Sequence, residues 1–192
     1  MRTFKRYILA MSIVGFIAFS PLLAFATSTV SIQLPVSTIH VGSFFDVLVD
    51  ISSVTDLYAF QFDIGFDPAI LSAIDVTEGP FLPSGGTTSF SAGFIDNAAG
   101  SISFNADSLI GAIPGVSGNG ALAALSFQAL ALGTSPLGLA NVILLDSNFA
   151  DISFNTGGAS SVDVRSAVEP GTMLLLGFGL VGLAGMRRFR RN

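Results

Sequence analysis

The sequence predicts an all-β fold, a jelly-roll or Greek-key β-sandwich of about nine strands, with an apolar segment at each end of the chain. Several runs alternate apolar and polar residues. A period of two residues, with one face of the sheet exposed to solvent, is typical of antiparallel sheet. Clusters of Gly, Pro, Asn and Asp separate the runs at the short spacing of a sandwich. The central region has no long run of helical period. We therefore expect a sandwich rather than a β-α-β architecture.

The first half of the domain contains the two clearest alternating runs. In residues 45–51 the odd positions are apolar, and in residues 58–66 the even positions are all large and apolar. Successive side chains of a strand point to opposite faces, so Asp46, Asp50 and Asp63 are expected on a solvated sheet face. The strands expected here are 29–34, 44–51, 57–66 and 70–77, with turns at Asp67-Pro68 and Gly79-Pro80 and a short helical turn near Pro68–Leu71.

The second half repeats the alternation in shorter runs. Ile102, Phe104 and Ala106 are expected on one apolar face, and residues 123–129 follow the same pattern. The strands expected here are 87–95, 101–107, 121–131, 137–145, 151–155 and 161–165. Turns between them are expected at Ser84-Gly85-Gly86, 96–100, Pro114-Gly115 and Gly118-Asn119-Gly120.

The N-terminal 26 residues have the order of a secretory signal peptide. Basic residues Arg2, Lys5 and Arg6 precede the apolar stretch 7–19, and Ala24-Phe25-Ala26 matches the small-residue cleavage site. We therefore assign residues 1–26 as a signal peptide, with Ala24 and Ala26 at the signal-peptidase site. Residues 27–166 then form the domain.

The C-terminal segment has an apolar run, 171–186, followed by four arginines, Arg187, Arg188, Arg190 and Arg191. A helix of 16 residues would span about 24 Å, somewhat less than the ~30 Å hydrocarbon core, and the arginines can snorkel to close part of the gap. Arginines favour the cytoplasmic side, so the run is expected to be a transmembrane helix with a stop-transfer cluster and the domain outside.

The residues before this run, Val168-Glu169-Pro170-Gly171-Thr172, complete a three-part pattern of short motif, apolar segment and basic end. Residues 167–192 resemble the PEP-CTERM sorting signal of Gram-negative bacteria. The resemblance implies processing near the motif by an exosortase, and delivery from a membrane-anchored precursor to the outer surface or the extracellular matrix. The usual Val-Pro-Glu-Pro is Ala-Val-Glu-Pro here, so the first proline is missing.

Charge is distributed very unevenly along the chain. Residues 27–166 contain twelve acids and one base, Arg165, a formal charge of −11, whereas the whole chain carries −5. Such a surface repels nucleic acid and anionic lipid and would attract cations or a basic protein. The chain has no cysteine, which excludes disulfides, cysteine catalysis and thiolate metal sites.

Three segments of the domain carry a second resemblance. They are Val41-Gly42-Ser43-Phe44, the run from Asp56 to Leu71 with its Ala-Phe-Gln-Phe and Asp-Pro elements, and Gly120 to Phe127. Together they resemble cohesin-type domains, with Ser43 in place of the usual acid. The resemblance implies a nine-stranded jelly roll. In cellulosomes such domains bind Ca²⁺-loaded dockerins, and in other envelope proteins their partners are unknown.

The residue inventory gives little support for catalysis. His40 is the only histidine, so a His-based metal site cannot be assembled, and a Ser-His-Asp triad would depend on a residue at a strand entry. Glycoside hydrolysis needs two acids flanking a sugar, but the acids here lie on outward strand positions or in turns, where Asp67, Asp96 and Asp146 fit Asx turns. We therefore predict no catalytic residues and no enzyme.

Two binding chemistries remain open from the sequence. Ca²⁺ could be held by Asp oxygens from separate loops, although no EF-hand run is present, so no metal ligand and no cofactor are assigned. Polysaccharide could bind through polar loops, although the chain has no Trp and the domain's only tyrosine, Tyr58, lies on the apolar phase. The twelve phenylalanines of the domain are mostly expected in the core.

The sequence thus predicts an exported, non-catalytic protein of the cell surface or extracellular polysaccharide matrix. Its expected partners are signal peptidase and an exosortase during export, and the membrane through the C-terminal helix. For the mature domain three roles stay open: a structural or adhesive role, a carbohydrate-binding module, and a protein-docking module that uses an acidic or Ca²⁺-dependent face. No nucleic acid is expected.

Overall fold

The computed structural model describes residues 27–166 and residue 178, so the predicted signal peptide lies outside the described residues. Ten strands and one 3-10 helix make up the described part: β1 Ser28–Gln33, β2 Ile39–His40, β3 Phe44–Gly65, β4 Leu71–Glu78, η1 Leu82–Gly85, β5 Phe94–Asp96, β6 Ser101–Ser108, β7 Val116–Ala129, β8 Gly133–Asp146, β9 Phe154–Thr156 and β10 Ser160–Arg165. The predicted all-β sandwich is confirmed. No described helix is long and apolar enough to cross a membrane.

The 22-residue strand β3 organises the fold because it belongs to both layers. Its first half pairs with β1 and β7, and its second half pairs with β6 and β8. The sequence predicted two separate strands here. Ser53 and Asp56 adopt positive φ angles of 55° and 59°, so the chain bends between the halves without leaving the sheet.

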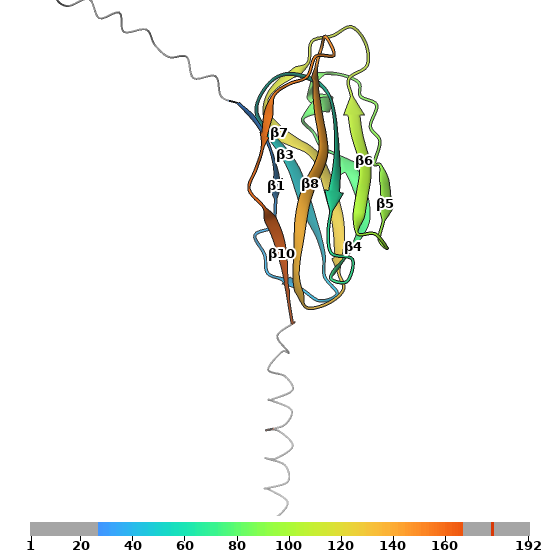
Figure 1. The fold of residues 1–192 in the computed structure, drawn as a ribbon, viewed down its shortest axis with the longest axis vertical. Coiled ribbons are helices and arrows are strands. Elements are labelled where there is room, and N and C mark those ends of the chain that lie inside the picture. Colours follow the sequence, from blue (N-terminus) through green and yellow to red (C-terminus); the bar gives the residue numbers. More distant parts are fainter. Residues whose placement is uncertain (1–26, 167–177, 179–192) are drawn as a thin grey trace, which may run out of the picture.

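Two layers result, and they pack face to face (Figure 1). One contains β9, β1, the first half of β3, β7 and β4, and the other contains β10, β8, the second half of β3, β6 and β5. The even positions of residues 58–66 are buried, as the alternation predicted. Phe127 lies fully buried in the core, with its ring centroid 5.9 Å from that of Phe45 and 5.3 Å from that of Phe66.

Several boundaries differ from the prediction because distant contacts decide them. The expected strand 87–95 is mostly irregular, with isolated bridges at Thr88 and Ser91 before β5 begins. Strand β7 starts five residues early and includes Gly120, where a Cβ would lie 2.7 Å from the Phe81 ring. The expected short helical turn near Pro68–Leu71 is present: the Asp67 carbonyl accepts hydrogen bonds from the N–H groups of Ile70 and Leu71. A 3-10 helix that the sequence did not predict lies at Leu82–Gly85.

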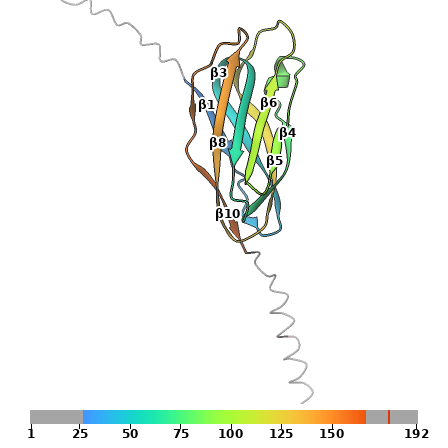
Figure 2. The same cartoon turned by 45° about the vertical axis from the view of Figure 1, so that its right-hand side comes forward.

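The described chain enters and leaves at opposite ends of the sandwich. In Figures 1 and 2 the start of β1 lies near the top and the end of β10 lies at the bottom. The bottom end also contains β2, the segment between β7 and β8, and the turn after β3. We call it the exit end, because the chain continues from there toward residues 167–192.

Candidate functional site

The outer face of the β8–β3–β6 sheet presents two rows of side chains. Direct pairing places Leu145, Ala59 and Ser108 in one row. The second row contains Ile143, Gln61 and Ala106, and the edge residue Ser91 extends it by its bridge to Ala106. Paired residues of antiparallel strands share a face, and Phe60 between the rows is buried on the other side. These rows, which we call the β8–β3–β6 face, are flat and small-residue-rich.

An open groove of about 420 Å³ lies on this face. Its walls come from all three strands and from the segment before β5: Ala59, Phe60, Gln61, Ser89, Ser91, Phe104, Ala106, Asp107, Ser108, Ile143 and Leu145. Ile143 and Phe104 are exposed hydrophobic side chains on opposite sides of the groove. A flat face with exposed apolar side chains on both sides of a groove suits the docking of another macromolecule.

Asp63 holds the strands at one end of the groove. Its Oδ1 accepts a hydrogen bond from the Phe104 backbone N–H at 2.7 Å, and its Oδ2 accepts one from Asn141 Nδ2 at 2.6 Å. Both donors sit in bulges, because the pairing of β3 shifts opposite each of them. Phe104 and Asn141 have φ angles of 58° and 48°, a left-handed conformation that is uncommon for a bulky residue.

The Phe104 bulge reverses the inside–outside phase of β6. Phe104 is 59% exposed, whereas Asn105 and Asp107 face the interior and are buried. The expectation that Ile102, Phe104 and Ala106 share an apolar face was therefore wrong. The register shift between Phe62 and Ile64 of β3 explains why the side chains of β6 reverse their phase at Phe104. An exposed aromatic on a strained residue is a candidate binding residue that the alternation misplaced.

Beneath this face lies a carboxylate pair, Asp107 and Glu78. Asp107 is 2% exposed, its Oδ1 accepts from the Ser108 N–H at 2.8 Å, and its Oδ2 has no hydrogen-bond partner. Burial, followed by the neighbouring carboxyl of Glu78, raises the pKa of Asp107 to about 7. Glu78 in turn accepts a short hydrogen bond from the Thr88 hydroxyl.

Acidic side chains border the β8–β3–β6 face. Asp151 pairs with Leu145 and so extends one row beyond β8, and Asp63 lies at the groove end. Asp56 closes the upper end, where its carboxylate accepts hydrogen bonds from Gly115 N–H at 2.6 Å and Ser147 Oγ at 2.7 Å. The Ser147 and Gly115 hydrogen bonds lower the pKa of Asp56. The border is therefore anionic around an apolar centre.

The three acids expected on one solvated face lie on two. Asp46 and Asp50 belong to the β1–β3–β7 layer, and Asp63 belongs to the other because β3 changes layer between them. Asp46 accepts a hydrogen bond from Ser126 Oγ at 2.6 Å. Burial raises the pKa of Asp50, whose Oδ1 has no partner. The prediction of one shared acidic sheet face was wrong.

The remaining sequence candidates have ordinary structural roles or lie outside the described residues. Asp67, Asp96 and Asp146 each accept backbone N–H groups in Asx turns, as predicted. Within residues 27–166, no three His, Asp or Glu side chains are grouped so that they could hold a metal ion. The processing motif, the arginine cluster and the signal-peptidase site fall outside the described residues: Val168, Glu169, Pro170, Gly171, Thr172, Arg187, Arg188, Arg190, Arg191, Ala24 and Ala26.

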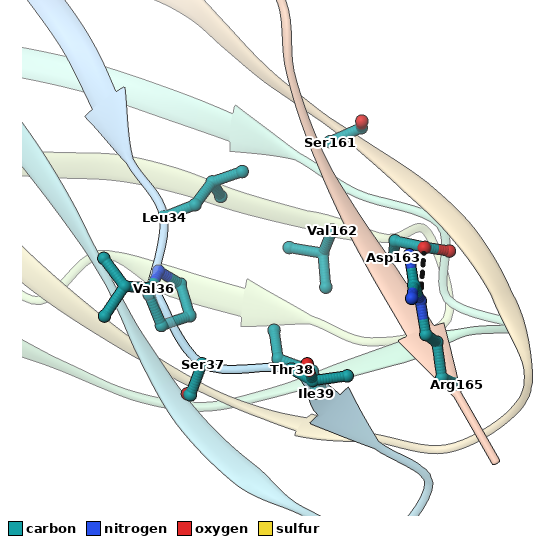
Figure 3. A pocket seen from close by; sticks show the side chains of 10 residues that line it. Leu34, Val36, Ser37, Thr38, Ile39, Ser161, Val162, Asp163 and Arg165 are labelled. Atoms are coloured by element: carbon teal, nitrogen blue, oxygen red, sulfur yellow. Dashed lines mark hydrogen bonds and ion pairs between the residues drawn. The ribbon is translucent and has the colours of Figure 1, made fainter.

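A second pocket, of about 240 Å³, lies at the exit end between segment 34–39 and β10. Figure 3 shows Leu34 and Val162 facing each other across it. Arg165 Nε donates to Asp163 Oδ2 at 3.0 Å, the one ion pair among the described residues. His40 Nδ1 lies 3.0 Å from the Ser166 carbonyl oxygen, so the only histidine helps fix the last described residues.

Two family models match the chain. The cohesin domain matches residues 29–164, and the PEP-CTERM protein-sorting motif matches residues 169–191. No curated protein matches.

Solved cohesin structures share the fold at low sequence identity. A non-cellulosomal cohesin from Archaeoglobus fulgidus is 15% identical with a TM-score of 0.57, covering 73% of this chain and 93% of that one. A type II cohesin from the cellulosome of Acetivibrio cellulolyticus is 19% identical with a TM-score of 0.60, covering 71% and 95%. A type I cohesin–dockerin complex from Clostridium thermocellum matches at 15% identity and a TM-score of 0.58, covering 73% and 100%.

Proposed function

This chain belongs to the cohesin family and carries a PEP-CTERM sorting motif, and we propose that it is an exosortase-sorted surface protein whose domain docks a protein partner. The β8–β3–β6 face is the observation that supports docking most directly. It combines an apolar groove with an anionic border, and its shape depends on two bulges that Asp63 fixes. Dockerin is the partner in the Clostridium thermocellum complex, and the proposal carries a dockerin-like module to this chain.

The chemistry of the face indicates what such a partner must offer. Phe104 and Ile143 provide apolar anchors, while the small side chains between them allow a close approach. Aromatic anchors typically contribute most at such interfaces. Asp63 and Asp151 favour lysine or arginine at the partner's edge, so association should be faster at low salt. The partner is thus a module with an apolar ridge and a basic rim.

Protein docking fits this face better than polysaccharide binding does. Sugar platforms commonly use Trp or Tyr, and the chain has no Trp. Tyr58 is buried, and its hydroxyl donates to the Gly111 carbonyl at 2.7 Å, so it is committed to the fold. The apolar groove and the anionic border are features that a basic protein surface complements directly.

Phe104→Ala is expected to weaken binding of the cognate partner at least tenfold, because an exposed aromatic anchor is lost. The matched control is Phe44→Ala, since Phe44 is 69% exposed but lies on the other layer. The probes are the dockerin modules encoded in the same genome, each loaded with Ca²⁺ and titrated by calorimetry. Equal losses for the two variants, or no binding by any dockerin, would contradict the proposal.

Processing makes a separate prediction. Intact mass of the surface-exposed protein is expected to show loss of residues 1–26 and of the segment beyond the motif. Val168→Pro restores the usual proline before Glu169 and should raise the processed fraction. Recovery of the complete C-terminus from cells that contain an exosortase would refute processing while leaving the docking proposal intact.

A further inference from the structure

The exit end carries an unusual group of exposed hydrophobic side chains. Six of them, which we call the exit-end patch, come from three neighbouring segments: Leu34, Val36, Val41, Phe44, Leu130 and Leu132. Val36 is fully exposed. An isolated exposed leucine needs no explanation, but a group at one end of a domain marks an interaction site.

Backbone contacts join two of these segments, and the third, with Leu34 and Val36, lies beside β10 in the pocket at this end. Gly42 N–H donates to the Ala129 carbonyl at 2.8 Å, and Ala129 N–H donates to the Ser43 carbonyl at 2.9 Å. Val41 N–H donates to the Arg165 carbonyl at 3.1 Å, which ties the patch to the last strand. The patch therefore lies at the end from which the chain leaves the domain.

The charge of this end differs from that of the rest of the domain. Segments 34–44 and 128–133 contain no Asp or Glu, although the domain as a whole has twelve acids. Its only arginine, Arg165, and its only histidine, His40, both lie here. Asp163 pairs with Arg165, and the turn residues Asp67 and Asp96 accept backbone N–H groups. This end is the part that an anionic surface would repel least.

The length of chain beyond the patch limits how far it can stand from the membrane. Six residues, 167–172, separate Ser166 from Met173 in the apolar run of the sorting signal, so seven Cα–Cα steps join the two. Fully extended, they reach at most about 25 Å. The headgroup layer takes up about 5–8 Å of that distance on each side. A short tether keeps the patch at high effective concentration next to the lipid.

We propose that the exit-end patch rests on the lipid surface while the precursor is anchored, with Val36 and Leu132 among the headgroups. This rests on the exosortase sorting proposed above and on the transmembrane helix that the sequence predicts at residues 171–186. The sandwich then stands on its exit end, so the β8–β3–β6 face, which runs along its length, points sideways and stays free for a partner (Figures 1 and 2).

The absence of cysteine from the chain allows a clean test. Val36→Cys and, at the opposite end, Thr87→Cys each create one site for an environment-sensitive nitrobenzoxadiazole label. The full-length chain is reconstituted into vesicles of phosphatidylethanolamine and phosphatidylglycerol that contain a spin-labelled quencher lipid. We expect a blue-shifted emission and several-fold stronger quenching at position 36 than at position 87.

A charge placed in the patch should remove that difference. Leu132→Asp is expected to restore the emission of the label at position 36 toward its value in water. Ile110→Asp is the matched control, because Ile110 is 55% exposed, close to the 61% of Leu132, but lies at the opposite end. Circular dichroism checks that both variants fold.

Each outcome separates the proposals. Suppose the chain sediments with vesicles, but the label at position 36 is as exposed to water as the label at position 87. This result overturns the proposed lipid contact and leaves membrane anchoring intact. A chain that does not sediment with vesicles overturns both. If the label is buried without lipid, and its burial increases with protein concentration, the patch binds a second copy of the chain. Quenching only when an exosortase is present would assign it to that enzyme, and either result overturns the proposal.

Discussion

Phe127→Ala is expected to lower the free energy of unfolding of the domain by about 3–5 kcal/mol, the usual cost of truncating a buried phenylalanine. Phe127 is fully buried on β7 and contacts Phe45 from one side and Phe66 from the other. Phe45 lies at the start of β3 and Phe66 directly follows its end, so the cavity could not collapse without moving the strand that joins the layers. Urea denaturation of residues 27–166 measures the change.

Phe94→Ala serves as the control for this substitution. Phe94 belongs to the edge strand β5 and is 69% exposed, so its removal should change the unfolding free energy by less than about 1 kcal/mol. A loss at Phe127 no larger than the loss at Phe94 would show that the aromatic cluster does not hold the two layers together.

Asp107→Asn is expected to stabilise the domain at pH 8 by about 1–3 kcal/mol, because it removes a buried charge while keeping the shape of the side chain. The pKa of Asp107 is raised from 3.8 to about 7, chiefly by burial. Between these values the folded state holds a proton that the unfolded state has released. The stability of the wild-type domain should therefore fall as the pH rises from about 4 to about 7, and level off above.

The pH dependence of the unfolding free energy of Asp107→Asn tests this explanation. The advantage of Asp107→Asn should shrink below pH 5, where the wild-type carboxyl is already protonated in the fold. Asp151→Asn is the control, since Asp151 is exposed and its substitution should change the unfolding free energy by less than about 0.5 kcal/mol. A destabilisation by Asp107→Asn that is equal at pH 5 and pH 8 would show that the carboxyl accepts essential hydrogen bonds instead.

Local alternation was sufficient to place most of the core. Tyr58, Phe60, Phe62, Ile64 and Phe66 are all buried, as the even phase of residues 58–66 required. The alternation failed at Phe104, where a bulge turned the aromatic outward and Asn105 and Asp107 inward. The failure falls on the candidate docking face, because the bulge is held by Asp63, a residue 41 positions away.

The acids show the same division. Their number and their position between two basic ends are visible in the sequence, and so are the Asx turns at Asp67, Asp96 and Asp146. Which of them share a face is not visible. Asp46 and Asp63 were expected together, yet the bend of β3 at Ser53–Asp56 places them on different layers.

The sequence by itself determined the all-β class, the inward phase of residues 58–66, the acidic domain and the resemblance to a sorting signal, because each is a local or compositional property. The tertiary structure alone decided that β3 is one strand shared by two layers, that Phe104 is exposed, and that six exposed apolar side chains lie at the end where the chain leaves. These features come from hydrogen bonds between residues far apart in the sequence, and no local pattern encodes such pairings.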